Sequence, residues 1–199
     1  MRKVIVIGSS TGGPSALEDL FKQLPAGLPV PILIAQHLPR PFTKTLADRL
    51  NHIGTLMVTE AKNNEIIEPA HAYVIPGDSH FFLTAPGPRI TLLPADDLPK
   101  PSVDMGFTSV AEHFGPGTIG VVLSGMGEDG VIGAKAVKQL GGKILVQDEA
   151  TSVIFGMPKR VIESGFFDEI VPLPRIAGRL VALVHPHTNP SQIGVGTSG

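Results

Sequence analysis

The chain has 199 residues, of which 17% are charged and 42% hydrophobic, a balance typical of one compact globular domain. Its formal net charge of −2 lacks the basic excess that nucleic-acid-binding proteins carry, so we expect no nucleic-acid partner. Cysteine is absent, which excludes disulfides and a cysteine nucleophile and is typical of a cytoplasmic protein. The sequence has no apolar run near the roughly 20 residues that cross a bilayer, and no signal-peptide core.

Apolar runs of strand length alternate with amphipathic helical segments along most of the chain. In chain order, the predicted strands cover residues 4–7, 32–36, 56–60, 118–124, 143–147 and 169–171. The first predicted helix begins near Pro14, and the others cover residues 42–52, 103–113, 130–140, 158–164 and 176–184. Strands that alternate with helices pair in parallel, with helices on both faces. We therefore expect a doubly wound, mostly parallel α/β sheet in a three-layer α/β/α arrangement.

The middle and the end of the chain have different patterns. Residues 72–75, 81–84 and 89–93 form short runs separated by Gly and Pro, which predicts an antiparallel hairpin attached to the main sheet. From residue 185 onward the chain is rich in Pro, Ser, Thr and Gly, which predicts a disordered tail. Because no internal repeat or linker divides the rest, we expect one domain over residues 1–184 and a tail over 185–199.

A G-x-S-x-G pattern at residues 8–12 follows the first predicted strand and precedes a helix. A serine on such a strand-to-helix turn exposes its hydroxyl beside backbone N–H groups, which makes Ser10 a candidate nucleophile for acyl transfer. Taken alone, the segment is equally compatible with Ser10 as a helix cap or with a turn that holds an anion. A dinucleotide site is not favoured, because G-x-G-x-x-G is missing and Gln36 stands where an acidic residue would hold the ribose.

Two further polar residues follow predicted parallel strands. His37 comes directly after the strand at residues 32–36, and Asp129 follows the strand at residues 118–124. Because sites in open α/β sheets form outside the carboxyl ends of the strands, we expect both residues beside Ser10. Together the three provide the groups of Ser-His-Asp acyl transfer. Taken singly, His37 is also typical of a hydrogen-bonded, partly buried histidine, and Asp129 of a cap on the helix near Gly130.

Backbone N–H groups are the candidates for binding an oxyanion. Met126 lies between two glycines that allow close approach of the backbone, and Thr11 directly follows the candidate nucleophile. The alternative for Met126 is an ordinary tight turn in which its side chain fills a gap.

A second polar cluster consists of His71, Asp78 and His80. Two imidazoles and a carboxylate can bind zinc, but a Pro-Gly pair interrupts their spacing and the sequence shows no fourth ligand. We therefore expect a structural turn there, with no metal and no cofactor.

Together these segments resemble the catalytic domain of the bacterial chemotaxis protein-glutamate methylesterases, the CheB-type methylesterase/glutamine deamidases. The resemblance runs from about residue 3 to residue 184 and rests on motifs at residues 7–13, 36–39, 71–78, 101–104, 125–130 and 147–158. It implies a doubly wound α/β fold with an antiparallel hairpin. It also implies Ser10 as nucleophile, His37 as base and Asp129 as orienting carboxylate. The backbone of Thr11 and Met126 would then lie near the oxyanion.

The implied reaction is hydrolysis of glutamate γ-methyl esters on the cytoplasmic helices of chemoreceptors, with release of methanol, and deamidation of receptor glutamines by the same chemistry. The resemblance implies no cofactor, a cytoplasmic location, and contact with the membrane only through receptors. A receiver domain or a chemotaxis kinase is the further partner implied for a full-length member. The alternatives are an esterase of the same fold with another protein or small ester as substrate, and a non-catalytic anion-binding module.

This sequence departs from the family pattern in two respects. We expect no receiver domain, because the first predicted strand already starts near residue 3, and this leaves an excised domain and a stand-alone protein as alternatives. Ser9 stands where the family more often has Ala, so a second hydroxyl competes for hydrogen bonds beside Ser10.

Overall fold

The computed structural model describes residues 2–97 and 99–185. The larger sheet contains β1 (Val4–Ser9), β2 (Ile32–Gln36), β3 (Met57–Glu60), β5 (His71–Val74), β8 (Thr118–Val122), β9 (Lys143–Gln147) and β10 (Glu169–Val171). The smaller sheet contains β4 (Glu65–Ile66), β6 (Ser79–Thr84) and β7 (Arg89–Pro94). The helices are α1 (Gly13–Phe21), α2 (Phe42–Ile53), α3 (Val103–Phe114), α4 (Val131–Gln139), α5 (Met157–Ser164) and α6 (Leu173–Val184), and a 3₁₀ turn covers Gly115–Gly117.

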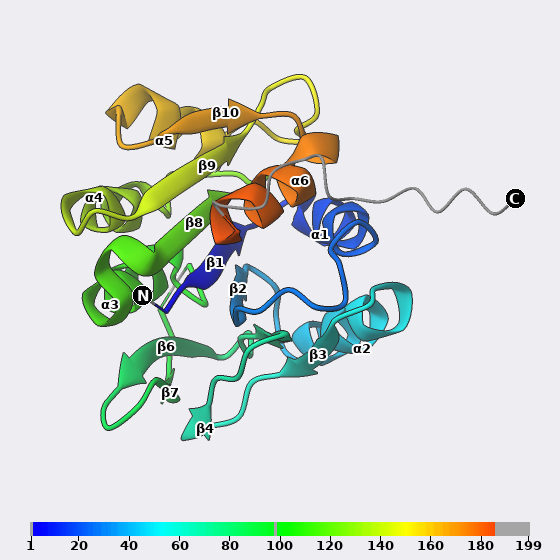
Figure 1. The fold of residues 1–199 in the computed structure, drawn as a ribbon, viewed down its shortest axis with the longest axis vertical. Coiled ribbons are helices and arrows are strands. Elements are labelled where there is room, and N and C mark those ends of the chain that lie inside the picture. The colour runs from blue at the N-terminus through cyan, green and yellow to red at the C-terminus, as the bar shows by residue number, and fades with distance from the viewer. Residues whose placement is uncertain (1, 98, 186–199) are drawn as a thin grey trace, which may run out of the picture.

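The larger sheet is parallel throughout the described residues and has the strand order β10-β9-β8-β1-β2-β5-β3. Figure 1 shows α1, α2 and α6 on one face of this sheet and α3, α4 and α5 on the other. The predicted doubly wound, mostly parallel α/β fold in three layers is confirmed.

The prediction for the middle of the chain is wrong for its first run. Residues 72–75 do not belong to a hairpin, because β5 pairs in parallel with β2 and β3 inside the larger sheet. The antiparallel hairpin is formed by β6 and β7, and β4, which we did not predict, pairs with β7. Ala72, Tyr73 and Val74 are almost fully buried, as expected for a strand covered on both faces. The run is too short for its apolar pattern to distinguish a hairpin strand from a buried parallel strand.

The central strand β1 is buried along its whole length, with side chains in two separate cores. Ile5 and Ile7 pack in the core on the α1, α2 and α6 face, whereas Val4 and Val6 pack in the core on the α3, α4 and α5 face. Alternation of side chains across a strand explains why a doubly covered strand is apolar at every position. The strand gives the turn that follows it a rigid support.

The chain reverses its direction of winding at β1. It adds β2 on one side of β1 and later adds β8 on the other side. In open α/β sheets, ligands bind outside the carboxyl ends of the strands at such a switch point. The segments that follow β1, β2 and β8 therefore meet at one place, and they carry Ser10, His37 and Asp129.

Asp168 joins α4, β9 and β10 at the opposite end of the strands. Its carboxylate accepts hydrogen bonds from Lys138 Nζ (2.6 Å), Lys143 Nζ (2.9 Å) and the Ile144 N–H (2.8 Å). Burial by itself raises the pKa of Asp168, but the bonds from Lys138 and the Ile144 N–H outweigh it and hold the pKa below its ordinary value.

The lowered pKa of Asp168 predicts acid sensitivity of the fold. Because the folded-state pKa lies below the unfolded-state value, Asp168 stabilises the fold above about pH 4, and this contribution is lost as the pH falls through the folded-state pKa. We expect the free energy of unfolding, measured by urea titration between pH 3 and 7, to fall less steeply below about pH 4 in Asp168→Asn than in the wild type. Parallel pH profiles of the two proteins would contradict this assignment.

No helix within the described parts of the chain is both long enough and apolar enough to cross a membrane. The predicted tail lies outside the described residues from position 186 onward, and His185 immediately follows α6.

Candidate active site

Ser10 lies on the turn between β1 and α1. Its N–H donates to the Ser124 carbonyl (3.0 Å), and its own carbonyl accepts from the Gly13 N–H (2.8 Å). The N-cap residue of α1 is Gly12, with φ of +83°, so Ser10 is not the helix cap. The Ser10 side chain is partly exposed, and its hydroxyl has no hydrogen-bond partner among the described residues. The hydroxyl is therefore available for chemistry.

Close packing requires glycine at two positions around this serine. A Cβ at Gly13 would lie 2.0 Å from Gln36 Oε1, and a Cβ at Gly125 would lie 2.9 Å from the Ser10 Cβ. The loop that begins at Gly125 thus lies directly against Ser10, and it brings the backbone of Met126 to the same place.

Gln36 joins the serine turn to the histidine segment. Its fully buried side chain donates from Nε2 to the carbonyls of Ser10 (2.9 Å) and His37 (3.2 Å). Its Oε1 accepts from the hydroxyl of Ser9 (2.6 Å). The Ser9 hydroxyl is therefore bound away from the Ser10 hydroxyl. We missed this role of Gln36, and the signal for it was an amide at the end of a buried strand, where it needs partners.

Ser9→Ala is expected to lower the free energy of unfolding by about 1–3 kcal/mol, because Gln36 Oε1 stays buried without its donor. Urea denaturation at neutral pH measures the loss. Ser10→Ala is the matched control, because the Ser10 hydroxyl bonds to none of the described residues, and its stability should stay within about 0.5 kcal/mol of the wild type. Equal stability of the two variants would contradict the assigned hydrogen bond.

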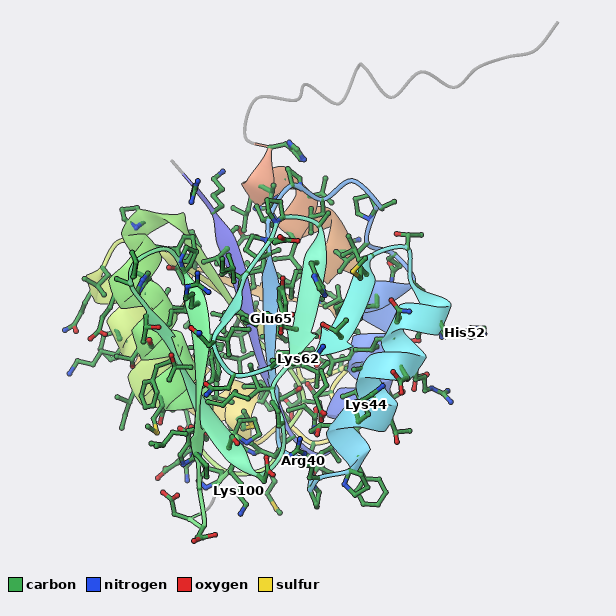
Figure 2. All side chains as sticks on the ribbon, turned by 90° about the horizontal axis from the view of Figure 1, so that it is seen from below. Arg40, Lys44, His52, Lys62, Glu65 and Lys100 are labelled. Atoms are coloured by element: carbon green, nitrogen blue, oxygen red, sulfur yellow. The ribbon has the colours of Figure 1, made fainter. Side chains whose placement is uncertain are left out.

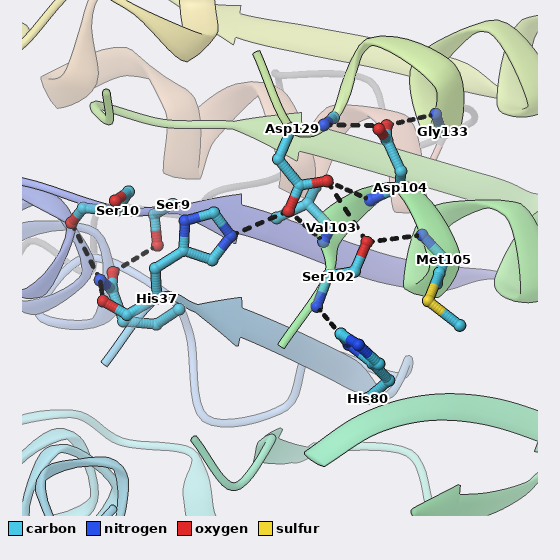
Figure 3. Close-up of polar contacts among 12 residues, drawn as sticks. Ser9, Ser10, His37, His80, Ser102, Val103, Asp104, Met105, Asp129 and Gly133 are labelled. Atoms are coloured by element: carbon cyan, nitrogen blue, oxygen red, sulfur yellow. Dashed lines mark hydrogen bonds and ion pairs between the residues drawn. The ribbon is translucent and has the colours of Figure 1, made fainter. Parts of the chain in front are cut away.

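His37 and Asp129 form a hydrogen-bonded pair next to the serine turn. The Nε2 of His37 lies 2.9 Å from Oδ2 of Asp129, and the two side chains are only 14% and 7% exposed. Figure 3 shows the imidazole between the serine turn and Asp129. Pairing of Nε2 leaves Nδ1 for a second partner. The structure has no hydrogen bond between Ser10 Oγ and the ring of His37, a contact that is often long before substrate binds.

Asp129 also binds the N-terminus of α3. Its Oδ2 accepts from the Val103 N–H (2.7 Å), and its Oδ1 accepts from the Asp104 N–H (2.9 Å) and lies 3.4 Å from the Ser102 hydroxyl. Asp129 therefore caps a helix, but that helix is α3 and not the one that follows it in sequence.

The surroundings of Asp129 keep it ionised. Burial by itself raises the pKa of Asp129, but the hydrogen bonds from His37 and from the N–H groups of Val103 and Asp104 outweigh burial and lower the pKa below its ordinary value. A carboxylate held in this way orients the imidazole and stabilises its protonated form.

The backbone N–H groups of Thr11 and Met126 are free of hydrogen bonds to described residues. The carbonyl of Thr11 accepts from the Ser124 hydroxyl (2.8 Å), and the loop before Met126 is held by the Gly125 N–H on the Ile154 carbonyl (3.0 Å). The side chain of Met126 is 70% exposed, so the structure excludes a gap-filling role for it. Two unused N–H groups on the segments beside a serine are candidate donors to an oxyanion.

A groove of about 930 Å³ opens beside the His37–Asp129 pair. Arg40 and Lys100 line it, and Figure 2 shows them near one another at the same edge of the molecule. Arg40 is held by Asp78 (2.7 Å). Ser10 and Thr11 are not among the residues that line the groove. The volume lies in the range of sites that bind small molecules.

His71, Asp78 and His80 each bond to residues outside this set of three. His71 bonds to Thr59 (2.9 Å), and His80 is buried and accepts the N–H of Ser102 at its Nδ1 (3.0 Å). Asp78 pairs with Arg40. Within the described residues, no three His, Asp or Glu side chains come together as a metal site.

The segment at residues 101–104 contributes more to the site than we expected. In the sequence this segment is only a motif of the resemblance, yet Ser102, Val103 and Asp104 all bind the Asp129 carboxylate. The signal was a serine two residues before an aspartate at the start of a helical pattern, which is typical of a helix N-terminus, where a carboxylate binds.

Known proteins resemble this chain over most of its length. The family model described as CheB methylesterase matches residues 5–180. The chain belongs to the CheB methylesterase family. The catalytic domain of the Thermotoga maritima CheB methylesterase, known from a crystal structure, superimposes with a TM-score of 0.88 at 42% identity. The match covers 92% of this chain and 99% of that domain, so the fold is that of a CheB catalytic domain.

Curated relatives of this CheB-family chain carry the name protein-glutamate methylesterase/protein-glutamine glutaminase. One from Alkalilimnicola ehrlichii is 43% identical over 91% of this chain and 47% of its own length. One from Thermotoga maritima is 42% identical over 92% of this chain and 54% of its own length. The chain spans about half the length of the curated relatives it matches.

Proposed function

We propose that this chain hydrolyses glutamate γ-methyl esters on the cytoplasmic helices of methyl-accepting chemoreceptors and releases methanol, using Ser10, His37 and Asp129. The proposal rests most directly on the His37–Asp129 hydrogen bond of 2.9 Å, next to a serine whose hydroxyl has no hydrogen-bond partner in the described part of the chain. The names of the family and of its curated relatives support the choice of ester.

In the proposed first half-reaction, Ser10 Oγ attacks the ester carbonyl while His37 Nδ1 takes its proton. The negative charge on the carbonyl oxygen is stabilised by the N–H groups of Thr11 and Met126. Asp129 stabilises the imidazolium through Nε2. His37 then gives the proton to the departing methoxide, and methanol leaves an acyl-enzyme on Ser10.

In the second half-reaction, water attacks the acyl-enzyme while His37 accepts one of its protons. Collapse of the tetrahedral intermediate returns that proton to Ser10 Oγ and releases the glutamate carboxyl group, which gives its remaining proton to solvent and becomes a carboxylate. A receptor glutamine would follow the same course with ammonia as the leaving group, and the words protein-glutamine glutaminase in the names of the relatives support this second substrate. The groove lined by Arg40 and Lys100 would receive the receptor helix around the ester.

The experiment is methanol release from chemoreceptor membranes whose glutamates carry radiolabelled methyl groups. We expect release proportional to the amount of protein and to time. A small ester such as p-nitrophenyl acetate, assayed in parallel, distinguishes receptor hydrolysis from general esterase activity. Receptors from several bacteria are included, so that one mismatched receptor does not decide the result. Turnover of the small ester without methanol release from any receptor would contradict the proposed substrate. The absence of both activities would contradict the proposed reaction.

A further inference from the structure

Asp104 makes two kinds of contact near Asp129: its backbone binds the Asp129 side chain, and its side chain binds the backbone that follows Asp129. Its N–H donates to Asp129 Oδ1 (2.9 Å), and its own Oδ1 accepts from the N–H groups of Gly130 (2.9 Å) and Gly133 (2.7 Å). Figure 3 shows Asp104 in contact with Asp129 and with Gly133, beside the His37–Asp129 pair. Asp104 thus binds both the side chain of Asp129 and the backbone of Gly130, the next residue in the chain.

The two carboxylates cap each other's helices. Asp129 precedes α4 in sequence but caps α3, whereas Asp104 lies in the first turn of α3 and caps α4. This exchange joins the starts of two helices through four N–H···O contacts, two to each carboxylate. The position of Asp129 relative to α3 therefore depends on Asp104 as well as on its own bonds.

Tight packing between α3 and α4 supports the arrangement. A Cβ at Gly133 would lie 3.1 Å from the Asp104 Cα and 2.6 Å from the Phe107 Cβ, so a larger residue would separate the helices. Gly130 has φ of +111°, a conformation that favours glycine and turns the loop sharply after Asp129. Both glycines bring a backbone N–H to the same oxygen of Asp104.

The position of Asp104 is unfavourable for its charge. Burial raises its pKa most, the Gly133 N–H lowers it, and the nearby Asp129 raises it again, so that the pKa lies above its ordinary value. A cap needed for stability alone would be better placed away from a second carboxylate. Its location next to Asp129 favours a role in the site.

We propose that Asp104 is a positioning residue that holds Asp129, and through it His37, in the geometry required for turnover. This inference rests on the proposed esterase function. In the proposed reaction, Asp104 forms no bond to the reacting atoms. It acts through the Gly130 and Gly133 N–H groups and through the start of α3.

The kinetic test compares Asp104→Ala, Asp104→Asn and Asp168→Ala in methanol release from receptor membranes. Asp104→Ala should lower kcat on the order of 10²-fold with little change in KM, because a displaced catalytic group costs about this much. Asp104→Asn keeps an acceptor oxygen for Gly130 and Gly133 and should recover most of kcat. Asp168→Ala removes a similarly bonded carboxylate at the far end of the strands, so it should lose stability but keep kcat.

A further variant at this position keeps the test decisive if Asp104→Ala folds poorly. Asp104→Glu keeps the charge but moves the acceptor oxygen by one methylene, so a positioning role predicts a lower kcat in a folded protein. An unchanged kcat in Asp104→Glu and Asp104→Ala, or no recovery in Asp104→Asn, would overturn the proposal.

A spectroscopic readout separates this inference from the esterase function. With ¹⁵N-labelled histidine, NMR reports the proton between His37 Nε2 and Asp129 without any substrate. We expect its signal to shift or broaden in Asp104→Ala and to stay unchanged in Asp168→Ala. An unchanged signal in Asp104→Ala would overturn the positioning role even in an active enzyme. A shifted signal in a protein that hydrolyses no ester would support the role while the esterase function failed.

Discussion

His37→Gln is expected to lower kcat for methanol release on the order of 10⁶-fold, the loss typical of removing the base of a Ser-His-Asp site. The glutamine amide has nearly the size of the imidazole and still offers a donor to Asp129, but it cannot accept the Ser10 proton. KM should change little, because the ring is assigned to proton transfer and not to holding the receptor. The measurement is steady-state methanol release, with circular dichroism to establish the fold.

The matched control is His113→Gln, at an exposed position near the end of α3. It should keep the wild-type rate. A rate for His37→Gln within tenfold of the wild type would contradict a histidine base.

Asp129→Asn is expected to lower kcat on the order of 10⁴-fold, because the ring of His37 loses the negative charge that stabilises its protonated form. The same substitution should lower the free energy of unfolding by about 1–3 kcal/mol. An asparagine has one acceptor oxygen, so the N–H of Val103 or of Asp104 is left without its partner. Methanol release and urea denaturation measure the two effects.

Asp168→Asn is the control for this prediction, because it removes a partly buried carboxylate at the opposite end of the strands. It should leave kcat unchanged. If Asp129→Asn retained full activity, the carboxylate would have no role in catalysis and the assigned site would be wrong.

The sequence predicts those parts of the fold in which neighbouring residues alone determine the secondary structure. The period of apolar residues predicted β2, β9 and β10 at the bounds that the structure has, because each is a short buried run between clear turns. The rule for open α/β sheets brought the segments after β1, β2 and β8 to one edge, since it depends only on strand direction and order.

What the sequence did not predict depends on contacts between distant segments. The cap that Asp129 forms on α3 joins residues 26 positions apart, and the bond from Ser9 to Gln36 joins residues 27 positions apart. A side chain at the start of one helix and a loop before another give no sign in sequence that they will exchange caps. The assignment of β5 failed for a related reason, because pairing partners decide between a hairpin and a parallel sheet.

The most direct test of the whole account is methanol release by the wild type and by Ser10→Ala from the same radiomethylated receptor membranes. Ser10→Ala removes only a hydroxyl that is unbonded among the described residues, so the fold and stability should be retained. We expect clear release by the wild type and a loss on the order of 10⁶-fold in the variant. Equal release by the two proteins would contradict Ser10 as the nucleophile and, with it, the mechanism derived from this site.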